Sequence, residues 1–225
     1  MTYLDVTGAY TADRAAALAG VPKSTLHYWA RTEILVPSVS PEKVKLWSFS
    51  DLLCLRFIGW LREPKIADDG QTVPASAMPK IRRALEELRG LELSIFDRRG
   101  DARILADKSG HVFIRTPDGV IVDGVRSGQL VFESIDLLAP FRSYGDLRGP
   151  DLIRPRPTLR IVPGKLSGAP HIAHTRIETE ALATLRARGF DLSMIGGLYP
   201  DAPAAGISDA IDLEEQLGRN GTLAA

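Results

Sequence analysis

The 225-residue chain is 44% apolar and 25% charged, a composition typical of globular proteins, and it is long enough for two or three compact units. It shows no apolar run near the roughly 20 residues of a membrane span and no leader-like N-terminus. The single cysteine excludes an internal disulfide, so we expect a cytoplasmic protein with no membrane partner. The net charge of zero argues against strong non-specific nucleic-acid binding by the whole molecule.

The first expected elements are two short helices joined by a tight turn. Thr11 suits the N-cap of a helix over 12–19, and Gly20 suits its end. A second helix is expected over 23–31. Such a pair is the geometry of the helix-turn-helix, which lays one helix in the major groove of DNA.

The second of these helices is expected to carry the residues that read DNA. Leu18, Val21 and Leu26 would hold the pair together, which leaves polar side chains facing outward. These are Lys23, Ser24, Thr25, His27, Tyr28 and Arg31. Such side chains can hydrogen-bond bases or phosphates. A turn-rich stretch follows, and Ser50 is expected to cap a third helix.

Residues 9–65 resemble the MerR-type winged helix-turn-helix. The likeness rests on the sequences Ala-Gly-Val at 19–21, Thr-Leu-x-Tyr at 25–28, Ile-Leu-x-Pro at 34–37 and Lys-Leu-Trp at 45–47. It implies DNA binding by the second helix, with Lys43 and Lys45 in the wing. His27 stands where the family usually has Arg, Trp47 replaces a Tyr, and Glu33 replaces a Gly. The alternative is a helical hairpin used only for packing or dimerisation.

The middle of the chain is expected to contain one connecting helix followed by short strands. Apolar residues at helical spacing predict a connecting helix over 77–89. Short strand-like runs at 103–106, 111–115, 119–122 and 129–132, separated by turns, predict a small antiparallel sheet. The connecting helix and this sheet are the candidate interface of a homodimer, since a two-fold operator needs two heads.

The last third is expected to be a small helical domain. A strand is expected within 158–162, followed by helices over 180–188, 192–198 and 209–217, the last capped by Ser208 and ended by Gly218. The predicted class is therefore α+β, with a winged helix-turn-helix, a central small antiparallel sheet and a C-terminal helical, helix-turn-helix-like domain. The predicted boundaries are 1–65, 66–143 and 144–225.

The C-terminal segment also carries a recognisable pattern. Gly168, Pro170, Ile172, the run Thr-Arg-Ile at 175–177, Gly189 and Tyr-Pro at 199–200 resemble a small family found in antitoxins whose partners are PIN-domain ribonuclease toxins. Ala169 stands where Lys is usual and His174 where Gly is usual. With the MerR-like head, the whole chain resembles a two-domain VapB-type antitoxin, which implies a VapC-type toxin and operator DNA as partners.

An excess of arginine marks the segment before this domain. Residues 142–176 carry seven Lys/Arg against two Asp, whereas residues 177–225 carry three Arg against eight Asp/Glu. One interpretation is a solvated linker that contacts DNA weakly. The sharper one pairs guanidinium groups with the carboxylates of a PIN nuclease. The candidate toxin-binding residues are Arg154, Arg156, Arg160, Arg176 and Arg219, although Arg176 also suits a structural role.

The sequence predicts no catalytic, metal or cofactor site. His171 and His174 lack a third ligand at metal spacing, and the usual phosphate-loop and hydrolase motifs do not occur. The leading hypothesis is an antitoxin that neutralises a PIN-domain ribonuclease and represses its own operator. The alternative is a MerR-like transcriptional regulator that responds to a small ligand through the central region.

Overall fold

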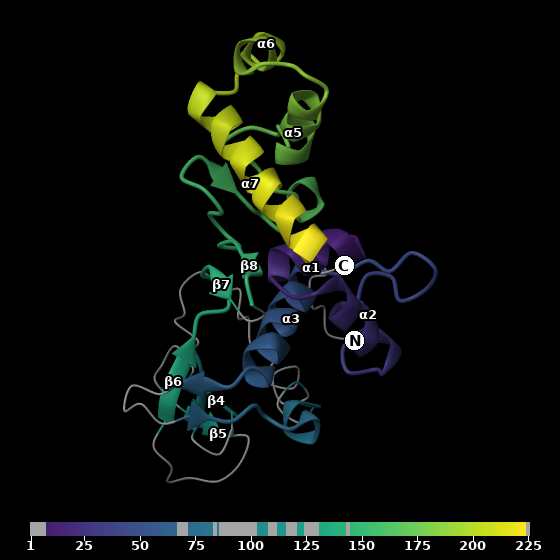
Figure 1. Cartoon of the computed structure of the whole chain (residues 1–225), viewed down its shortest axis with the longest axis vertical. Coiled ribbons are helices and arrows are strands. Elements are labelled where there is room, and N and C mark those ends of the chain that lie inside the picture. Colours follow the sequence, from purple (N-terminus) through teal and green to yellow (C-terminus); the bar gives the residue numbers. More distant parts are fainter. Residues whose placement is uncertain are drawn as a thin grey trace. The chain divides into compact units, whose positions relative to one another are not determined.

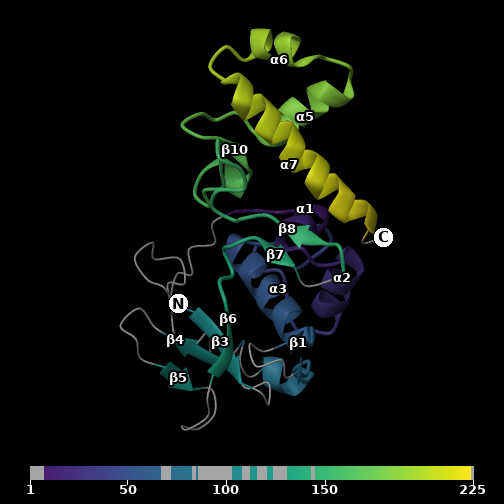
Figure 2. The same ribbon diagram turned by 60° about the vertical axis from the view of Figure 1, so that its left-hand side comes forward.

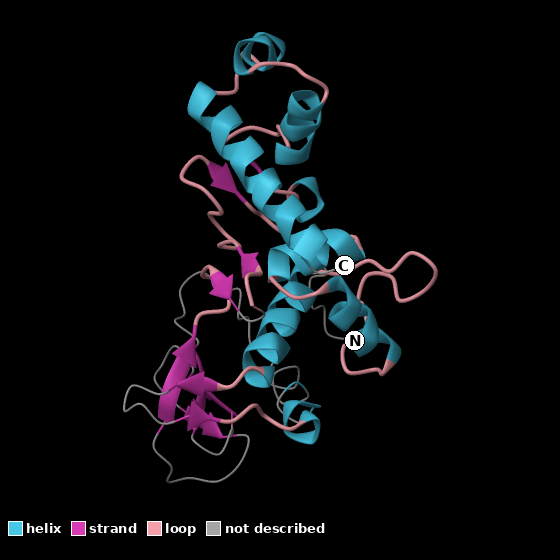
Figure 3. Cartoon of the chain, viewed as in Figure 1, coloured by secondary structure: helices cyan, strands magenta, loops and turns pink. Residues whose placement is uncertain are grey.

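The computed structural model describes residues 8–66, 72–82, 85, 103–107, 112–115, 121–123, 131–142 and 145–223. The chain divides into two compact units. The first unit joins Met1–Arg56 with Leu138–Ala225, and the second unit is Phe57–Leu137. The predicted α+β class, with small antiparallel sheets, is confirmed (Figure 3).

Helices are the longest regular elements of the first unit. Its elements are α1 (Ala12–Ala19), α2 (Lys23–Arg31), the first half of α3 (Phe49–Arg62), β7 (Phe141–Arg142), β8 (Arg148–Gly149), β9 (Leu159–Arg160), the short 3-10 helix η1 (Leu166–Gly168), β10 (His171–Ile172), α5 (Thr179–Ala187), α6 (Leu192–Leu198) and α7 (Ala204–Leu223). β7 pairs with β8, and β9 with β10, both antiparallel.

The second unit contains the predicted central sheet. Its strands are β1 (Lys65–Ile66), β2 (Thr72–Val73), β3 (Arg103–Asp107), β4 (Val112–Arg115), β5 (Ile121–Asp123) and β6 (Val131–Ile135). β1 and β2 form a hairpin, and the other four form an antiparallel sheet in the order β5-β4-β3-β6. Of the predicted connecting helix, residues 78–82 and 85 are described and helical, with Ile81 and Leu85 buried. Ala77 is described but lies before the helix, and the other residues of the predicted span lie outside the described part.

α1 and α2 have the predicted bounds because local signals determine them. The Thr11 side chain accepts a hydrogen bond from the Arg14 amide and caps α1. Gly20 ends this helix with φ 70°, a left-handed conformation that glycine adopts without strain. Leu18, Val21 and Leu26 are buried, as the helix-turn-helix interpretation requires.

The predicted cap of α3 is wrong. The helix begins at Phe49, so Ser50 lies inside it, and Ser48 is the cap. The Ser48 hydroxyl accepts from the Asp51 amide at 3.1 Å, while the Asp51 carboxylate accepts from the Ser48 amide at 2.8 Å. This reciprocal pair is a capping box with Asp as its acid. The Asp51 carboxylate also accepts from the Ser38 amide and hydroxyl, which fixes the chain that leads into the wing.

α7 is longer than predicted at both ends, because packing overrides its local signals. Ser208 and Gly218 lie inside the helix rather than at its ends. The helix begins after Pro203, whose carbonyl accepts from the Gly206 and Ile207 amides. Buried positions then recur at helical spacing through Ile207, Ala210, Leu213, Leu217 and Asn220. This stripe packs against α5, α6 and α1, so α7 joins the C-terminal segment to the first helix of the chain (Figures 1 and 2).

Candidate nucleic-acid interface

The exposed face of α2 carries most of the predicted DNA-reading residues. Ser24, His27, Tyr28 and Arg31 are exposed, and Thr25 is half-buried. Leu26, Trp29 and Ala30 form the opposite, buried face. The Arg31 guanidinium lies over the Tyr28 ring, 5.9 Å from its centroid, a cation–π contact that limits the freedom of both side chains. α2 therefore presents a polar, partly ordered face of the kind that enters a major groove.

Lys23 lies at the first turn of this helix and already has a partner. Its ammonium group is 2.6 Å from the Asp13 carboxylate, and the two side chains are 44% and 72% exposed. An exposed pair of this kind contributes little to stability and is easily exchanged. A phosphate can replace Asp13 at small cost, so Lys23 stays available to DNA.

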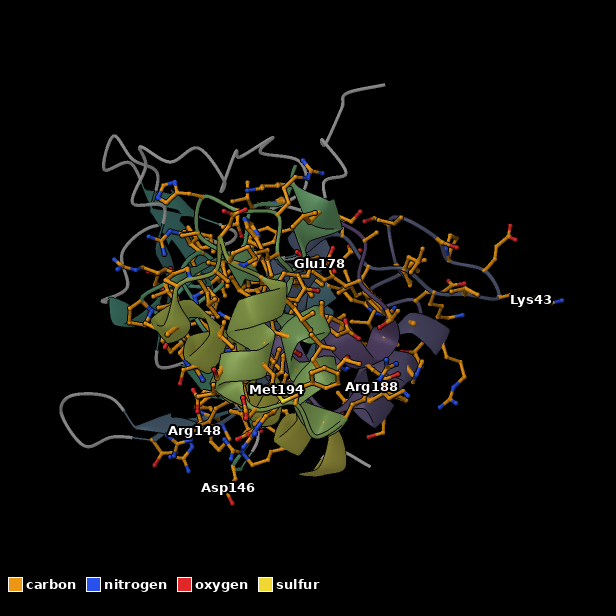
Figure 4. The ribbon with its side chains drawn as sticks, turned by 90° about the horizontal axis from the view of Figure 1, so that it is seen from above. Lys43, Asp146, Arg148, Glu178, Arg188 and Met194 are labelled. Atoms are coloured by element: carbon orange, nitrogen blue, oxygen red, sulfur yellow. The ribbon has the colours of Figure 1, made fainter. Side chains whose placement is uncertain are left out.

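The wing projects the second predicted set of cations. Its base is held by isolated bridges between Ser40 and Leu46 and between Tyr10 and Trp47. Lys43 is exposed at the outer end of the loop and points away from the rest of the unit (Figure 4). Lys45 instead donates to the backbone carbonyls of Pro41 and Glu42, at 3.3 and 3.4 Å. The structure thus makes Lys43 the freer of the two wing lysines.

Two residues that depart from the family patterns adopt left-handed backbone conformations. Glu33, between α2 and the wing, has φ 55°, and His174, in the turn after β10, has φ 64°. Both stand where the resembled families usually have glycine. Only glycine takes this conformation without a steric penalty, which explains the family preference. Glu33 is also an exposed acid next to the recognition helix.

The predicted toxin-binding arginines do not form one cluster of equivalent groups. Arg156 is committed within the fold: it donates to Asp212 at 2.6 Å, to Gln216 at 2.7 Å and to the Pro155 carbonyl. Arg154 and Arg160 donate to the Pro157 carbonyl, and Arg160 also donates to the Leu159 carbonyl.

Two of the predicted toxin-binding arginines have guanidinium groups that are not engaged by other described residues. Arg176 and Arg219 are exposed, and among the described residues neither has a hydrogen-bonding or ionic partner. Arg176 is therefore not the buried structural fork that sequence reasoning kept as an alternative. These two residues are the free candidates for binding an acidic partner.

A largely buried ion pair, which sequence reasoning missed, ties the N-terminal helices to the C-terminal ones. Arg14 of α1 makes a two-pronged contact with Glu214 of α7, with N–O distances of 2.5 and 2.6 Å. Thr179 at the start of α5 donates its hydroxyl to the same carboxylate. Burial by itself lowers the pKa of Arg14, but pairing with Glu214, helped by Glu180, more than offsets it, so the pKa is raised. The guanidinium stays charged in its buried place.

Tyr10 makes a second such link. Its hydroxyl donates to the Gly168 carbonyl at 2.9 Å, and the Ala9 amide donates to the Ser167 carbonyl nearby. Burial raises the pKa of the Tyr10 phenol, and the charge of Arg14 lowers it less. Tyr10 also bridges to Trp47, so one residue connects the wing base with the segment before β10.

Arg56 is the third missed residue and is fully buried. Its guanidinium donates to the Leu18 carbonyl at the end of α1 at 2.8 Å, to the Ala139 carbonyl at 2.7 Å and to the Pro150 carbonyl. It also lies over the Phe141 ring, 5.6 Å from the centroid. The available signal was an arginine inside the apolar run 52–58, which indicates a buried cation but not its partners.

Two families of known proteins match parts of this chain. Residues 10–66 match the model of the MerR HTH family regulatory proteins. Residues 160–212 match the model of a protein of unknown function, DUF433. The chain carries an N-terminal MerR-family helix-turn-helix domain and a C-terminal DUF433 domain. No curated protein and no solved structure matches the chain.

The MerR match agrees with the geometry of α1, α2 and the wing, and the family is one of DNA-binding regulators rather than enzymes. Within the described residues, no helix has the length and apolar character to cross a membrane. The same part of the chain brings together no group of three potential metal-binding side chains.

Proposed function

We propose that this protein is a transcriptional regulator that binds operator DNA as a homodimer through α2 and the wing. The observation that carries the proposal is the exposed polar face of α2, with His27, Tyr28 and Arg31, beside a wing whose Lys43 projects outward. An α-helix of this kind fits the major groove, and a wing lysine fits the flanking phosphates. Ser24, Thr25, Lys23 and Lys45 complete the proposed contact set.

Alanine substitutions test this proposal. We expect Lys23→Ala, His27→Ala and Arg31→Ala each to weaken binding to a duplex from the protein's own promoter by about 1–3 kcal/mol if they contact bases. If they contact phosphates, the loss is similar for all sequences and the salt dependence becomes flatter. Arg188→Ala, directly after α5, is the matched control, since Arg188 is also exposed but lies in the DUF433 domain. Unchanged affinity in all three variants in a gel-shift titration would refute the assignment of α2.

We further propose that the regulator is a VapB-type antitoxin whose C-terminal domain binds and neutralises a PIN-domain ribonuclease. Support comes from the residue pattern over 168–200 and from the open guanidinium groups of Arg176 and Arg219. A planar guanidinium can pair two-pronged with the carboxylates that such a nuclease uses. Arg154 and Arg160 remain candidates, whereas Arg156 is a weak one because it holds α7 in place.

The nuclease proposal is tested on the full chain. We expect Arg176→Glu and Arg219→Glu to abolish inhibition of a PIN ribonuclease encoded next to the gene, since reversal adds repulsion to the lost pairing. Arg188→Glu is the control for general charge effects. Full inhibition by both variants, with unchanged circular dichroism, would refute the role of these residues.

A ligand-responsive regulator is the alternative. It is favoured by the separate second unit, Phe57–Leu137, which carries its own four-stranded sheet. If the wild-type chain binds operator DNA but does not inhibit the nuclease, this alternative is favoured over the antitoxin.

A further inference from the structure

The β7–β8 hairpin places two arginines directly opposite each other. Arg142 pairs with Arg148 in the antiparallel register, and both side chains are exposed. Like charges opposite each other destabilise a hairpin. The available counter-charge is Asp146, 3.8 Å from Arg142 in a pair whose side chains are 61% and 84% exposed. No carboxylate in the described part of the chain pairs with Arg148, so the hairpin keeps positive charge that its own fold does not neutralise.

This hairpin is attached to the helix-turn-helix through its backbone. A Cβ atom on Gly20, the turn between α1 and α2, would lie only 2.6 Å from the Gly149 nitrogen, so the two segments are in close contact. Arg56 donates to the carbonyls of Ala139 and Pro150, which flank the hairpin, and to that of Leu18 at the end of α1. One buried guanidinium therefore fixes the hairpin next to the turn that leads into α2.

The other edge of the hairpin is held by α7. The side chains of Gln216 and Asn220 both donate to the Arg148 carbonyl, at 2.7 and 2.9 Å. The Arg148 backbone is thus immobilised while its side chain extends outward, together with Asp146, at the edge of the molecule (Figure 4). With the backbone already held, binding through Arg148 costs the ordering of its side chain and not that of the hairpin backbone.

We propose that Arg142 and Arg148 form a phosphate-binding site that contacts the backbone of duplex DNA beside the groove read by α2. The inference rests on the proposed DNA binding by α2 and the wing, and it adds a contact outside the MerR-family match. A guanidinium fits a phosphate two-pronged, and such contacts fix the register of a protein on the duplex without reading sequence. Attachment to the α1–α2 turn favours DNA over an acidic protein surface, because the hairpin then moves with the recognition helix.

The test compares the full-length Arg142→Gln/Arg148→Gln variant with wild type and with Arg186→Gln/Arg188→Gln, which removes the same charge from exposed positions on and after α5. The probe is a fluorescein-labelled duplex of random sequence, and anisotropy titrations are repeated over a series of KCl concentrations. Two lost phosphate contacts should reduce the slope of log K against log salt by about 1.8. We expect the α5 control to keep the wild-type slope. We also expect the hairpin variant to melt no lower than wild type, because a repulsive pair has been removed.

Three results would overturn this inference. They are an unchanged slope in the hairpin variant, an equal loss in the α5 control, and a lowered melting temperature that accounts for the loss of binding. If Arg31→Ala and Lys43→Ala reduce the slope while the hairpin variant does not, DNA binding by α2 and the wing stands and only the hairpin site is refuted. If the wild-type chain binds no duplex, the proposed function itself fails.

Discussion

Neutralising Glu214 is expected to cost the first unit far more stability than neutralising Asp212, which lies two residues earlier on α7. The Glu214 side chain is 11% exposed and that of Arg14 is 19% exposed, so Glu214→Gln leaves a largely buried guanidinium facing a neutral amide. The glutamine oxygen can still accept from Thr179, and the change therefore removes charge and little else. Breaking a buried pair costs about 3–5 kcal/mol, and the residual exposure here lowers our expectation to about 2–4 kcal/mol.

Asp212→Asn is the matched control, because Asp212 also pairs with an arginine from outside α7. The Arg156–Asp212 pair has the same kind of 2.6 Å contact, but Asp212 is 60% exposed. Solvent screens such a pair, so we expect a loss of about 1 kcal/mol or less. The double variant Arg14→Met/Glu214→Met should recover most of the stability, since apolar residues of similar volume can replace a buried ion pair at little cost.

Urea denaturation measures these differences in the full chain. Trp29 and Trp47 lie in the first unit, so a Trp60→Phe background makes tryptophan fluorescence report on that unit alone. Equal losses for Glu214→Gln and Asp212→Asn would contradict the argument from burial. The double variant could also prove no more stable than Arg14→Met or Glu214→Gln. The stability loss would then come from the lost packing and hydrogen-bond geometry of the pair, and not from an uncompensated charge.

Three further outcomes are expected, each measured by denaturation of the full chain. Glu33→Gly and His174→Gly should each stabilise by about 1 kcal/mol, because glycine relieves the left-handed backbone; a loss of stability at either site would contradict this. Gly168→Ala should destabilise by more than about 2 kcal/mol, since its Cβ would lie 2.1 Å from the Tyr10 hydroxyl oxygen, and Tyr10→Phe should rescue part of the loss. Burial lowers the pKa of His171, so the folded state resists protonation; stability should be full above the ordinary pKa of about 6.5 and fall as pH drops through that value. His171→Asn should flatten this dependence between pH 7 and 5, and the exposed His174→Asn should not.

The N-terminal helices could be predicted from sequence because local signals determine them. Thr11 and Gly20 have the right chemistry at the two ends of α1, and the apolar spacing shows which face is buried. The start of α3 could not be decided in this way. Ser48 and Ser50 are equally good caps by residue type, and it is the contact of Asp51 with Ser38 that selects the first.

α7 shows the opposite case, in which local signals mislead. Ser208 and Gly218 have the residue types of a helix start and a helix end. Both are exposed, however, and the helix continues past them because Ile207 on one side and Asn220 on the other are buried. The side chain of Asn220 donates to the Ala17 carbonyl, a partner that no local pattern indicates.

In the candidate interface, too, some residues could be identified from local sequence patterns and others could not. The exposed face of α2 follows from helical spacing alone, so the residues expected to read DNA could be chosen from sequence. The arginines of the basic stretch could not be sorted, since no residue next to Arg156 or Arg176 in the sequence indicates which of the two has a partner. One is bound to Asp212, 56 residues away, and the other is exposed. The roles of such residues depend on contacts that only the fold brings together.

The two family matches cover separate segments, yet the first unit joins them in one core. Arg14, Tyr10 and Arg56 belong to the N-terminal match, and their partners Glu214, Gly168 and Pro150 come from the second stretch of the first unit, Leu138–Ala225. Each of these links connects buried or nearly buried polar groups, which are costly to leave without partners. α1 therefore depends on α7 and on the segment before β10 for its environment. A partner that displaced α7 would therefore also remove the support of the first helix of the MerR-family domain, and we expect such a displacement to weaken DNA binding.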